Sequence, residues 1–232
     1  MFSLEVSNLT KTYKKKTVLD SISFSVEENK TAVFLGLDDS GKTTLAKVLS
    51  LIIKPNSGVI KYNEREIADY FEPFNLVSIM PSEEGLSEHL TVFENLRLMA
   101  RTRDLSEKDA ISLINELALK YDIKDRFDDK VLTLSKSLKK LVSFIMCIVS
   151  GANVLVLDEP FKDSDIKMQK LLLKYIKELK GTKTIIITTE IPSIALDLAD
   201  DLYILNNGKI EMYSNEIELE ELENILLNAE VK

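Results

Sequence analysis

The sequence contains one cysteine, Cys147, and one histidine, His89. A single cysteine excludes an internal disulfide framework and any metal cluster built on cysteines. A single histidine excludes a metal site with several histidine ligands. Glycine is also scarce, with 7 in 232 residues, and none lies between Gly85 and Gly151. A motif in that interval must therefore be built without the backbone freedom that glycine provides.

Long hydrophobic runs are few. The N-terminal segment MFSLEVSNLTKTYKKK is too polar for a signal peptide. The uncharged run 141–157 falls short of the roughly 20 apolar residues of a spanning helix, and Ser150-Gly151-Ala152-Asn153 interrupts it. We interpret it as a buried helix over 136–149 followed by a buried strand over 153–157. A cytoplasmic chain that does not itself cross the membrane is expected.

Charge and composition indicate which kinds of partner the chain binds and how many domains it forms. The chain has 30 basic and 38 acidic residues, a net charge of −8, which argues against nucleic acid or anionic lipid as the main direct partner. With 45% apolar and 29% charged residues, the composition is that of a globular protein. No repeat, linker or low-complexity segment divides it, so residues 1–232 are expected to form a single domain.

Short apolar segments alternate with helical patterns along most of the chain. Two early segments, Ser3–Asn8 and Val18–Val26, favour an exposed antiparallel sheet. The strands expected after them are Thr31–Leu37, Val59–Tyr62, Val154–Leu157, Thr184–Thr188 and Leu202–Leu205. Helices are expected at 42–52, from 91 and from 106, at 164–180 and 191–200, and as an acidic tail at 215–230. This alternation predicts βαβ units and a parallel sheet, that is, an α/β fold.

A phosphate-binding loop stands between one buried strand and a helix. Its eight residues fit G-x-x-x-x-G-K-[ST] and are Gly36, Leu37, Asp38, Asp39, Ser40, Gly41, Lys42 and Thr43, with Thr44 next in the helix. The glycines let backbone N–H groups face a phosphate, Lys42 reaches the β/γ-phosphates, and Thr43 ligates Mg²⁺. The two aspartates cost electrostatic energy beside a triphosphate unless they point outward or bind other groups. The alternative is a chance match in a strand–helix turn.

Two acids follow the buried strand 153–157. In a parallel sheet, ligands bind beyond the carboxyl ends of the strands. Asp158 is expected to hold Mg²⁺, and Glu159 to orient or deprotonate the attacking water. Pro160 fits a loop at this point. An ordinary strand-to-loop exit is the alternative.

In order and spacing, these motifs resemble the ATP-binding subunits of ABC transporters over nearly the whole chain, most closely the branch that works with exporter-type permeases. Tyr13 takes the position of the aromatic residue that stacks on adenine in that family. The other matching segments are 81–86 with 90–96 (the Q-loop and the permease-facing helix), 134–140 (the signature), 161–165 (the D-loop) and 187–190 (the switch position).

The resemblance implies a P-loop NTPase core with an N-terminal antiparallel β subdomain and a helical subdomain over about 85–150. It implies ATP and Mg²⁺ as cofactors, and a homodimer or heterodimer with another ABC ATPase subunit. In that dimer, Ser135 would contact the γ-phosphate of ATP on the opposite subunit. It also implies a separate membrane permease that holds the chain at the inner face of the membrane, with no role for nucleic acid.

The sequence departs from the family pattern at four positions. Glu190 replaces the switch histidine, Ser82 the usual glutamine or glutamate, and Ser137 and Asp39 two glycines. Because a carboxylate opposes charge on the γ-phosphate, we expect a subunit that binds Mg-ATP but hydrolyses it slowly. The alternatives are a regulatory module without hydrolysis, or a soluble ABC-type ATPase. A kinase or GTPase is disfavoured, since no N-K-x-D pattern occurs.

Overall fold

The computed structural model describes residues 2–66, 76–83, 85–103 and 105–228. Glu84 of the expected Q-loop and the end of the expected tail helix, 229–230, lie outside the described residues. The strands are β1 (Phe2–Tyr13), β2 (Lys16–Glu27), β3 (Thr31–Leu35), β4 (Ser57–Tyr62), β5 (Arg65–Glu66), β6 (Val77–Met80), β7 (Val154–Asp158), β8 (Thr184–Thr189), β9 (Asp201–Asn206) and β10 (Lys209–Tyr213). The α-helices are α1 (Lys42–Leu49), α2 (Val92–Ala100), α3 (Glu107–Lys120), α4 (Lys136–Val149), α5 (Ile166–Leu179), α6 (Pro192–Leu198) and α7 (Leu219–Asn228).

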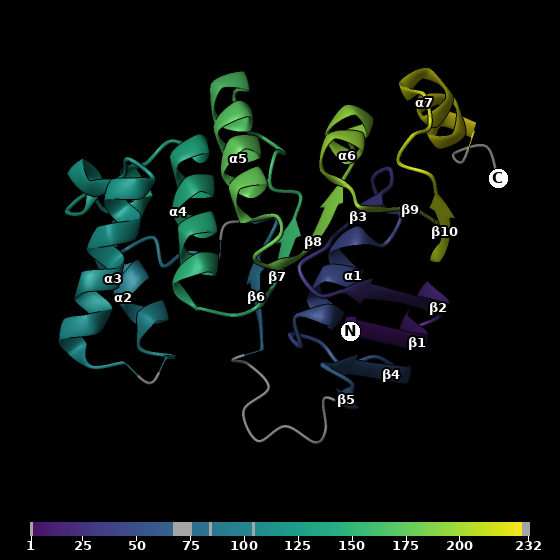
Figure 1. Cartoon of the computed structure of the whole chain (residues 1–232), viewed down its shortest axis with the longest axis horizontal. Coiled ribbons are helices and arrows are strands. Elements are labelled where there is room, and N and C mark those ends of the chain that lie inside the picture. Colours follow the sequence, from purple (N-terminus) through teal and green to yellow (C-terminus); the bar gives the residue numbers. More distant parts are fainter. Residues whose placement is uncertain (1, 67–75, 84, 104, 229–232) are drawn as a thin grey trace.

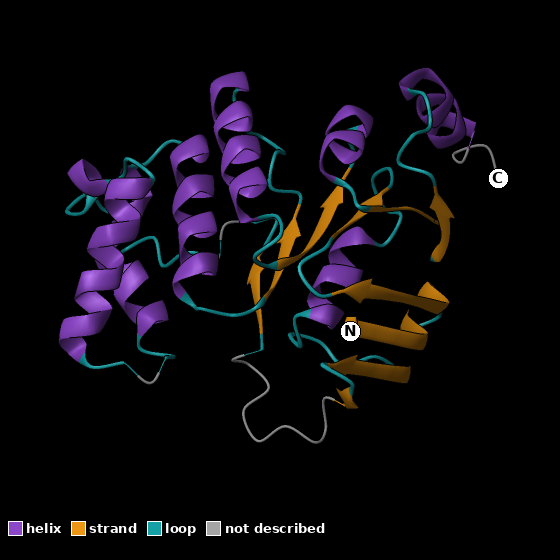
Figure 2. Ribbon diagram, in the orientation of Figure 1, coloured by secondary structure: helices purple, strands orange, loops and turns teal. Residues whose placement is uncertain are grey.

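The larger sheet lies at the centre of the molecule and has the strand order β10-β9-β3-β8-β7-β6 (Figures 1 and 2). From β9 to β6 all pairings are parallel, and β10 joins by an antiparallel hairpin. Alternate residues of one strand enter different cores: Val33 and Leu35 pack beneath the helices, whereas Ala32 and Phe34 pack on the side of α1. Both faces are therefore buried, as the continuous apolar runs predict.

The second sheet has the order β2-β1-β4-β5 and is antiparallel throughout. Helix α1 lies between this sheet and the central one (Figure 1), and its Leu45 and Leu49 are fully buried in the core that they share. The first turn of α1 is thereby fixed beside the carboxyl ends of β3 and β7, where the functional site forms.

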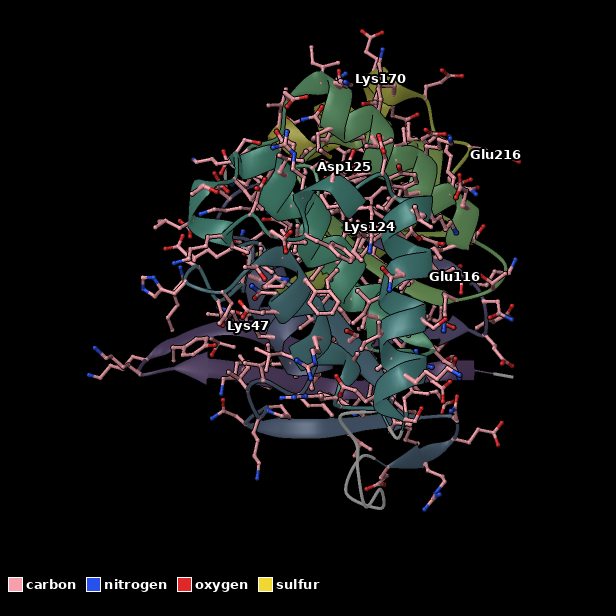
Figure 3. All side chains as sticks on the ribbon, turned by 90° about the vertical axis from the view of Figure 1, so that its left-hand side faces the viewer. Lys47, Glu116, Lys124, Asp125, Lys170 and Glu216 are labelled. Atoms are coloured by element: carbon pink, nitrogen blue, oxygen red, sulfur yellow. The ribbon has the colours of Figure 1, made fainter. Side chains whose placement is uncertain are left out.

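Helices α2, α3 and α4 form a layer at the opposite end of the molecule, and Glu116 of α3 and Lys124 lie at the front of the view from that end in Figure 3. Thr91 caps α2 and forms a capping box with Glu94. Ser106 caps α3 through a bond from the Asp109 amide, and α4 has the predicted bounds. Cys147 of this helix is fully buried. Among the described helices, none is both long and apolar enough to cross a membrane.

The α/β class and the parallel sheet are confirmed, and the differences are local. Strand β3 ends at Leu35 rather than Leu37, because the chain turns there into the phosphate-binding loop. Helix α1 ends at Leu49 rather than 52, since Leu51 has a positive φ of 65°. The tail helix begins at Leu219 rather than 215, and it is not solvated all round: Leu222 and Leu226 are buried in the core beneath the helices. Strands β5 and β6 were not predicted.

Candidate nucleotide-binding site

The loop between β3 and α1 is shaped by its two glycines. A Cβ on Gly36 would lie 2.6 Å from the carbonyl oxygen of Leu205, so no larger residue fits. Gly41 has a φ of 110°, in the left-handed region where glycine is favoured. Asp39, where the family usually has glycine, adopts a φ of 61° and is exposed, a conformation that aspartate tolerates better than most residues. The backbone thus keeps a glycine-like path despite the substitution.

Lys42, the first residue of α1, is 6% exposed. Its Nζ donates hydrogen bonds to the carbonyl oxygens of Gly36 (2.9 Å) and Leu37 (2.8 Å). It also lies 3.1 Å from Oε1 of Glu159, forming a buried ion pair. The ammonium group is therefore held inside the loop by oxygen atoms alone, the kind of atoms that a phosphate offers.

A cluster of oxygen atoms at the ends of β7 and β8 adjoins this loop. Oδ1 of Asp158 accepts hydrogen bonds from the hydroxyls of Thr188 (2.7 Å) and Thr43 (3.4 Å). Its other oxygen, Oδ2, is buried and has no hydrogen-bond partner in the described part of the chain. An orphaned carboxylate oxygen beside a hydroxyl suits a hard cation such as Mg²⁺, which commonly binds through one or two carboxylates together with substrate phosphates. The donor set therefore fits the expected metal.

Glu159 is 4% exposed and has a φ of 49°. Its backbone N–H donates to the carbonyl oxygen (3.1 Å) and the hydroxyl (3.2 Å) of Thr188. From helix α4, the buried Lys140 reaches the carbonyl oxygens of Glu159 (3.4 Å) and Ser82. Burial raises the pKa of the Glu159 carboxyl, while the charge of Lys42 opposes that shift. A carboxylate that is fixed, buried and more basic than usual is suited to accept a proton from water.

The raised pKa of Glu159 predicts a pH-dependent stability. Between the ordinary glutamate value of 4.5 and the raised value, the folded state binds more protons than the unfolded state. The unfolding free energy of the nucleotide-free protein should therefore fall, relative to that of Glu159→Gln, as the pH rises through this window. Urea unfolding between about pH 4 and pH 9 measures the difference. A difference that instead grows with pH would show that pairing with Lys42 outweighs burial. Glu221→Gln, on the exposed side of α7, is the control.

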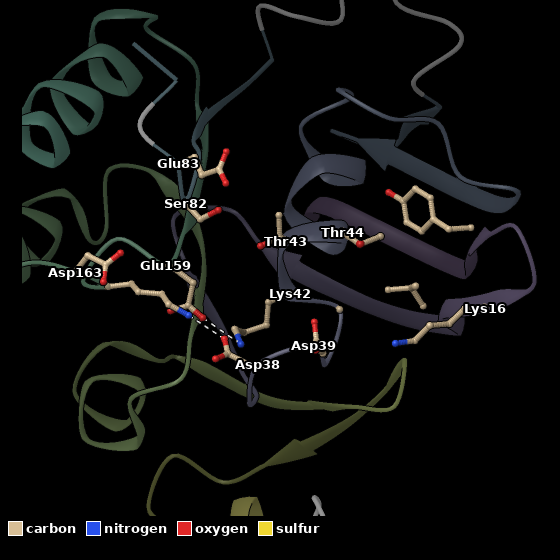
Figure 4. A pocket seen from close by; sticks show the side chains of 14 residues that line it. Lys16, Asp38, Asp39, Lys42, Thr43, Thr44, Ser82, Glu83, Glu159 and Asp163 are labelled. Atoms are coloured by element: carbon tan, nitrogen blue, oxygen red, sulfur yellow. Dashed lines mark hydrogen bonds and ion pairs between the residues drawn. The ribbon is translucent and has the colours of Figure 1, made fainter. Parts of the chain in front are cut away.

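Lys42, Thr43 and Glu159 line a cavity of about 490 Å³, in which Lys42 and Thr43 lie between Glu159 on one side and Lys16 on the other (Figure 4). The lining brings together residues far apart in the sequence: Tyr13, Lys16, Val18, Asp38, Asp39, Gly41, Lys42, Thr43, Thr44, Ser82, Glu83, Glu159, Lys162 and Asp163. Tyr13 is 45% exposed, with the ammonium of Lys11 5.2 Å from its ring centroid. The cavity thus runs from an aromatic ring to a buried carboxylate.

Five predicted site residues are not part of the lining. Asp158 lies behind Thr43, whose hydroxyl donates to its Oδ1 at 3.4 Å. Gly36 and Leu37 lie behind Lys42 and hold it through their carbonyl groups. Ser40 closes the loop by donating its N–H to the Leu37 carbonyl at 3.3 Å. Ser135 is exposed at the start of α4, where its hydroxyl accepts the Leu138 N–H at 3.3 Å.

Sequence reasoning missed Lys162, which contacts Asp38 of the phosphate-binding loop and Glu190, one of the four departures. Its Nζ lies 2.8 Å from Oδ1 of Asp38 and 3.6 Å from Oε2 of Glu190. The hydrogen bond from Lys162 lowers the pKa of Asp38, and that same bond raises the pKa of Lys162 to about 12. Of the two loop aspartates expected to repel a triphosphate, Asp38 therefore has its charge offset by Lys162. Thr188, whose hydroxyl binds Asp158, was also missed. Its place near the end of β8, the strand beside β7, could have indicated that contact.

Ser137, which stands in place of a signature glycine, is bonded to the predicted D-loop. Its hydroxyl donates to Oδ2 of Asp165 (2.7 Å) and accepts the Asp165 N–H (3.3 Å). The other carboxylate oxygen of Asp165 caps α5 by accepting the Met168 N–H at 2.9 Å. The serine thus links the beginnings of α4 and α5.

Comparisons with known proteins agree with this geometry. A family model described as ABC transporter matches residues 19–162. An uncharacterized ABC transporter ATP-binding protein of Methanocaldococcus jannaschii is 31% identical over 211 residues, covering 90% of this chain and 76% of that protein. The spermidine/putrescine import ATP-binding protein PotA of Mycoplasma capricolum is 30% identical over 214 residues, covering 90% of this chain and 60% of that protein.

Among solved structures, one described as an ATP-binding subunit of an ABC transporter superposes with a TM-score of 0.85 and 26% identity, covering 97% of this chain and 99% of that one. This likeness confirms the predicted P-loop NTPase fold with its antiparallel and helical additions. The matched sequence spans the phosphate-binding loop and the Asp158-Glu159 pair. The chain therefore belongs to the ABC transporter family, as one of its ATP-binding subunits.

Proposed function

We propose that this chain binds Mg-ATP in the cavity between Tyr13 and Glu159 and couples it to a separate membrane permease. The observation that carries the proposal is the arrangement of Lys42, Thr43 and Asp158. The ammonium of Lys42 is held by oxygen atoms, and the hydroxyl of the next residue, Thr43, contacts the carboxylate whose other oxygen has no partner in the described part of the chain. When bound, Mg²⁺ neutralises charge on the phosphates. Thr43 and Asp158 would supply its protein ligands.

Different residues along the cavity bind different parts of the nucleotide. Tyr13 offers a ring face to adenine, and the loop from Gly36 to Thr44 offers backbone N–H groups and hydroxyls to the phosphates. Lys42 exchanges two carbonyl oxygens for β- and γ-phosphate oxygens. Thr43 and Asp158 hold the metal, and Glu159, released from Lys42, orients the attacking water.

Pairing with a second ABC subunit is part of the proposal. Ser135 does not line the cavity of its own chain and is exposed at the N-terminus of α4, so it is available to the nucleotide of a partner arranged head to tail. The partner is a second copy or a different ABC ATPase. Light scattering of Glu159→Gln with and without Mg-ATP tests this: a dimer that forms only with the nucleotide supports it, and a dimer that ignores Ser135→Ala contradicts the role of Ser135.

We further propose that hydrolysis is slow, because position 190 offers a carboxylate where the γ-phosphate needs a donor. Glu190→His should raise the steady-state rate of phosphate release by about tenfold, a fraction of what one preorganised donor contributes elsewhere. Glu159→Gln is the matched control and should abolish the rate. Wild-type turnover as fast as that of the histidine variant would contradict slow hydrolysis.

A regulatory module that binds ATP without hydrolysis is the second candidate, favoured by the ion pair that holds Glu159 on Lys42. The same phosphate-release assay separates this candidate from a slow ATPase. A slow ATPase loses its rate in Glu159→Gln, whereas a non-hydrolysing module shows no rate that depends on Glu159.

Export is the proposed direction, on the likeness of residues 81–96 to the exporter branch. PotA, one of the relatives, is named for import. Affinity purification of the chain from its native membranes tests both coupling and direction: stable co-purification of an exporter-type permease supports the proposal, and an importer-type permease reverses the direction. Attachment to the inner face of the membrane depends on that complex.

A further inference from the structure

Lys162 lies where three segments of the chain meet at one end of the cavity. It follows Phe161, whose fully buried side chain anchors the loop after β7. Its ammonium contacts Asp38 of the phosphate-binding loop and Glu190 beyond β8, and it lines the cavity. Tyr13 and Lys16 line the cavity too, and Lys16 lies across it from Glu159 (Figure 4). A triphosphate that stacks its base on Tyr13 would therefore bring its last phosphate toward Lys162.

The carboxylates near Lys162 would repel a terminal phosphate unless a cation can turn from them to the phosphate. Asp38, Glu190 and Glu159 all act on Lys162 with carboxylates, and Lys42 is already paired with Glu159. A terminal phosphate entering here would meet three negative groups, and like charges a few ångströms apart repel strongly in a partly buried site. Without Lys162, Lys42 would have to offset this repulsion as well as the charge of Glu159.

Lys162 can change partners at little cost. Its side chain is 36% exposed, that of Glu190 35% and that of Asp38 77%, and ion pairs this exposed contribute little to stability. Its pKa of about 12 keeps it charged at every physiological pH. A phosphate oxygen offers Lys162 a charge-assisted bond of the same kind as these carboxylates do.

We propose that Lys162 is the residue by which this site distinguishes a nucleoside triphosphate from a diphosphate, its ammonium binding the γ-phosphate beside Asp38 and Glu190. The inference deepens the proposed function and rests on nucleotide occupying this cavity. It places a cation for phosphate binding beside Glu190, which stands at the switch position.

The test is the affinity for two probes in the presence of Mg²⁺, ADP and the non-hydrolysable triphosphate AMP-PNP, measured by isothermal titration calorimetry. Lys162→Met should weaken AMP-PNP by about tenfold or more and ADP by less than about twofold. Lys162→Arg, which keeps the charge, should restore most of the preference. Lys177→Met, which removes another exposed lysine paired with an aspartate (Asp197), is the control and should change neither affinity.

Equal weakening of both nucleotides, or no change in either, would overturn the role of Lys162. If Lys162→Met does not fold, Lys162→Gln removes the charge but keeps a polar side chain, and the same expectation applies to it. A wild-type chain that binds neither probe defeats the proposed function itself, an outcome distinct from binding without a Lys162-dependent preference.

Discussion

Replacing Lys42 with methionine should lower the affinity for Mg-ATP by about 100-fold or more. Two charge-assisted hydrogen bonds contribute roughly 1.5–3 kcal/mol each, and every 1.4 kcal/mol is about tenfold in affinity. The methionine side chain fills similar space but cannot bind phosphate. Titration with a fluorescent ATP analogue measures the loss. Lys47→Met on the same helix, at a residue labelled in Figure 3, is the matched control and should leave the affinity unchanged.

The same substitution should destabilise the nucleotide-free protein. Removing Lys42 leaves the buried carboxylate of Glu159 without its ion pair, and breaking a buried pair from one side costs about 3–5 kcal/mol. Protonation of Glu159 relieves this cost, so the loss should be larger at pH 8 than at pH 5. The double variant Lys42→Met with Glu159→Gln should recover stability but not affinity. Unchanged ATP affinity in Lys42→Met would remove Lys42 from the phosphate site.

Asp158→Asn should make nucleotide binding insensitive to Mg²⁺. We expect the unpartnered oxygen Oδ2 to face the metal, and an amide loses the charge that a hard cation requires. The oxygen of the amide can still accept the Thr188 hydroxyl, so the fold should be retained. Titrating ATP with and without Mg²⁺ should show an enhancement of about tenfold or more in the wild type and none in the variant.

Asp201→Asn is the control for this experiment, because Asp201 begins β9 at the other end of the sheet. It should keep the Mg²⁺ enhancement. Equal enhancement in Asp158→Asn would mean that Asp158 serves only to position Thr188 and Thr43.

Features carried by contiguous residues were predictable from the sequence. The loop 36–43 and the acid pair are local patterns, and the caps of α2 and α3 are set by residues three apart. Contacts between distant segments were not predictable. Lys162 meets Asp38 across 124 positions, and no local pattern indicates which carboxylate a loop lysine will contact. Thr188 reaches Asp158 only because β7 and β8 are neighbours in the sheet.

The underestimated length of β1 and β2 has a physical cause. Their pairing shifts register between Val6 and Leu9 and again before Lys11, and Asn8 and Ser21 adopt positive φ. Each irregularity interrupts the alternation of apolar and polar residues by which a strand is predicted, although the strand itself continues.

The two hydrogen bonds between Ser137 and Asp165 have a mechanical consequence. The carboxylate that Ser137 binds is also the one that caps α5. If α4 rotates relative to the central sheet, either the first turn of α5 moves with it, or the hydrogen bonds between Ser137 and Asp165 break and the cap of α5 is weakened. Movement of α4 would thus be transmitted to the loop before α5, which carries Lys162. A glycine at position 137 has no hydroxyl and could not make these two bonds, so it would transmit less of that movement.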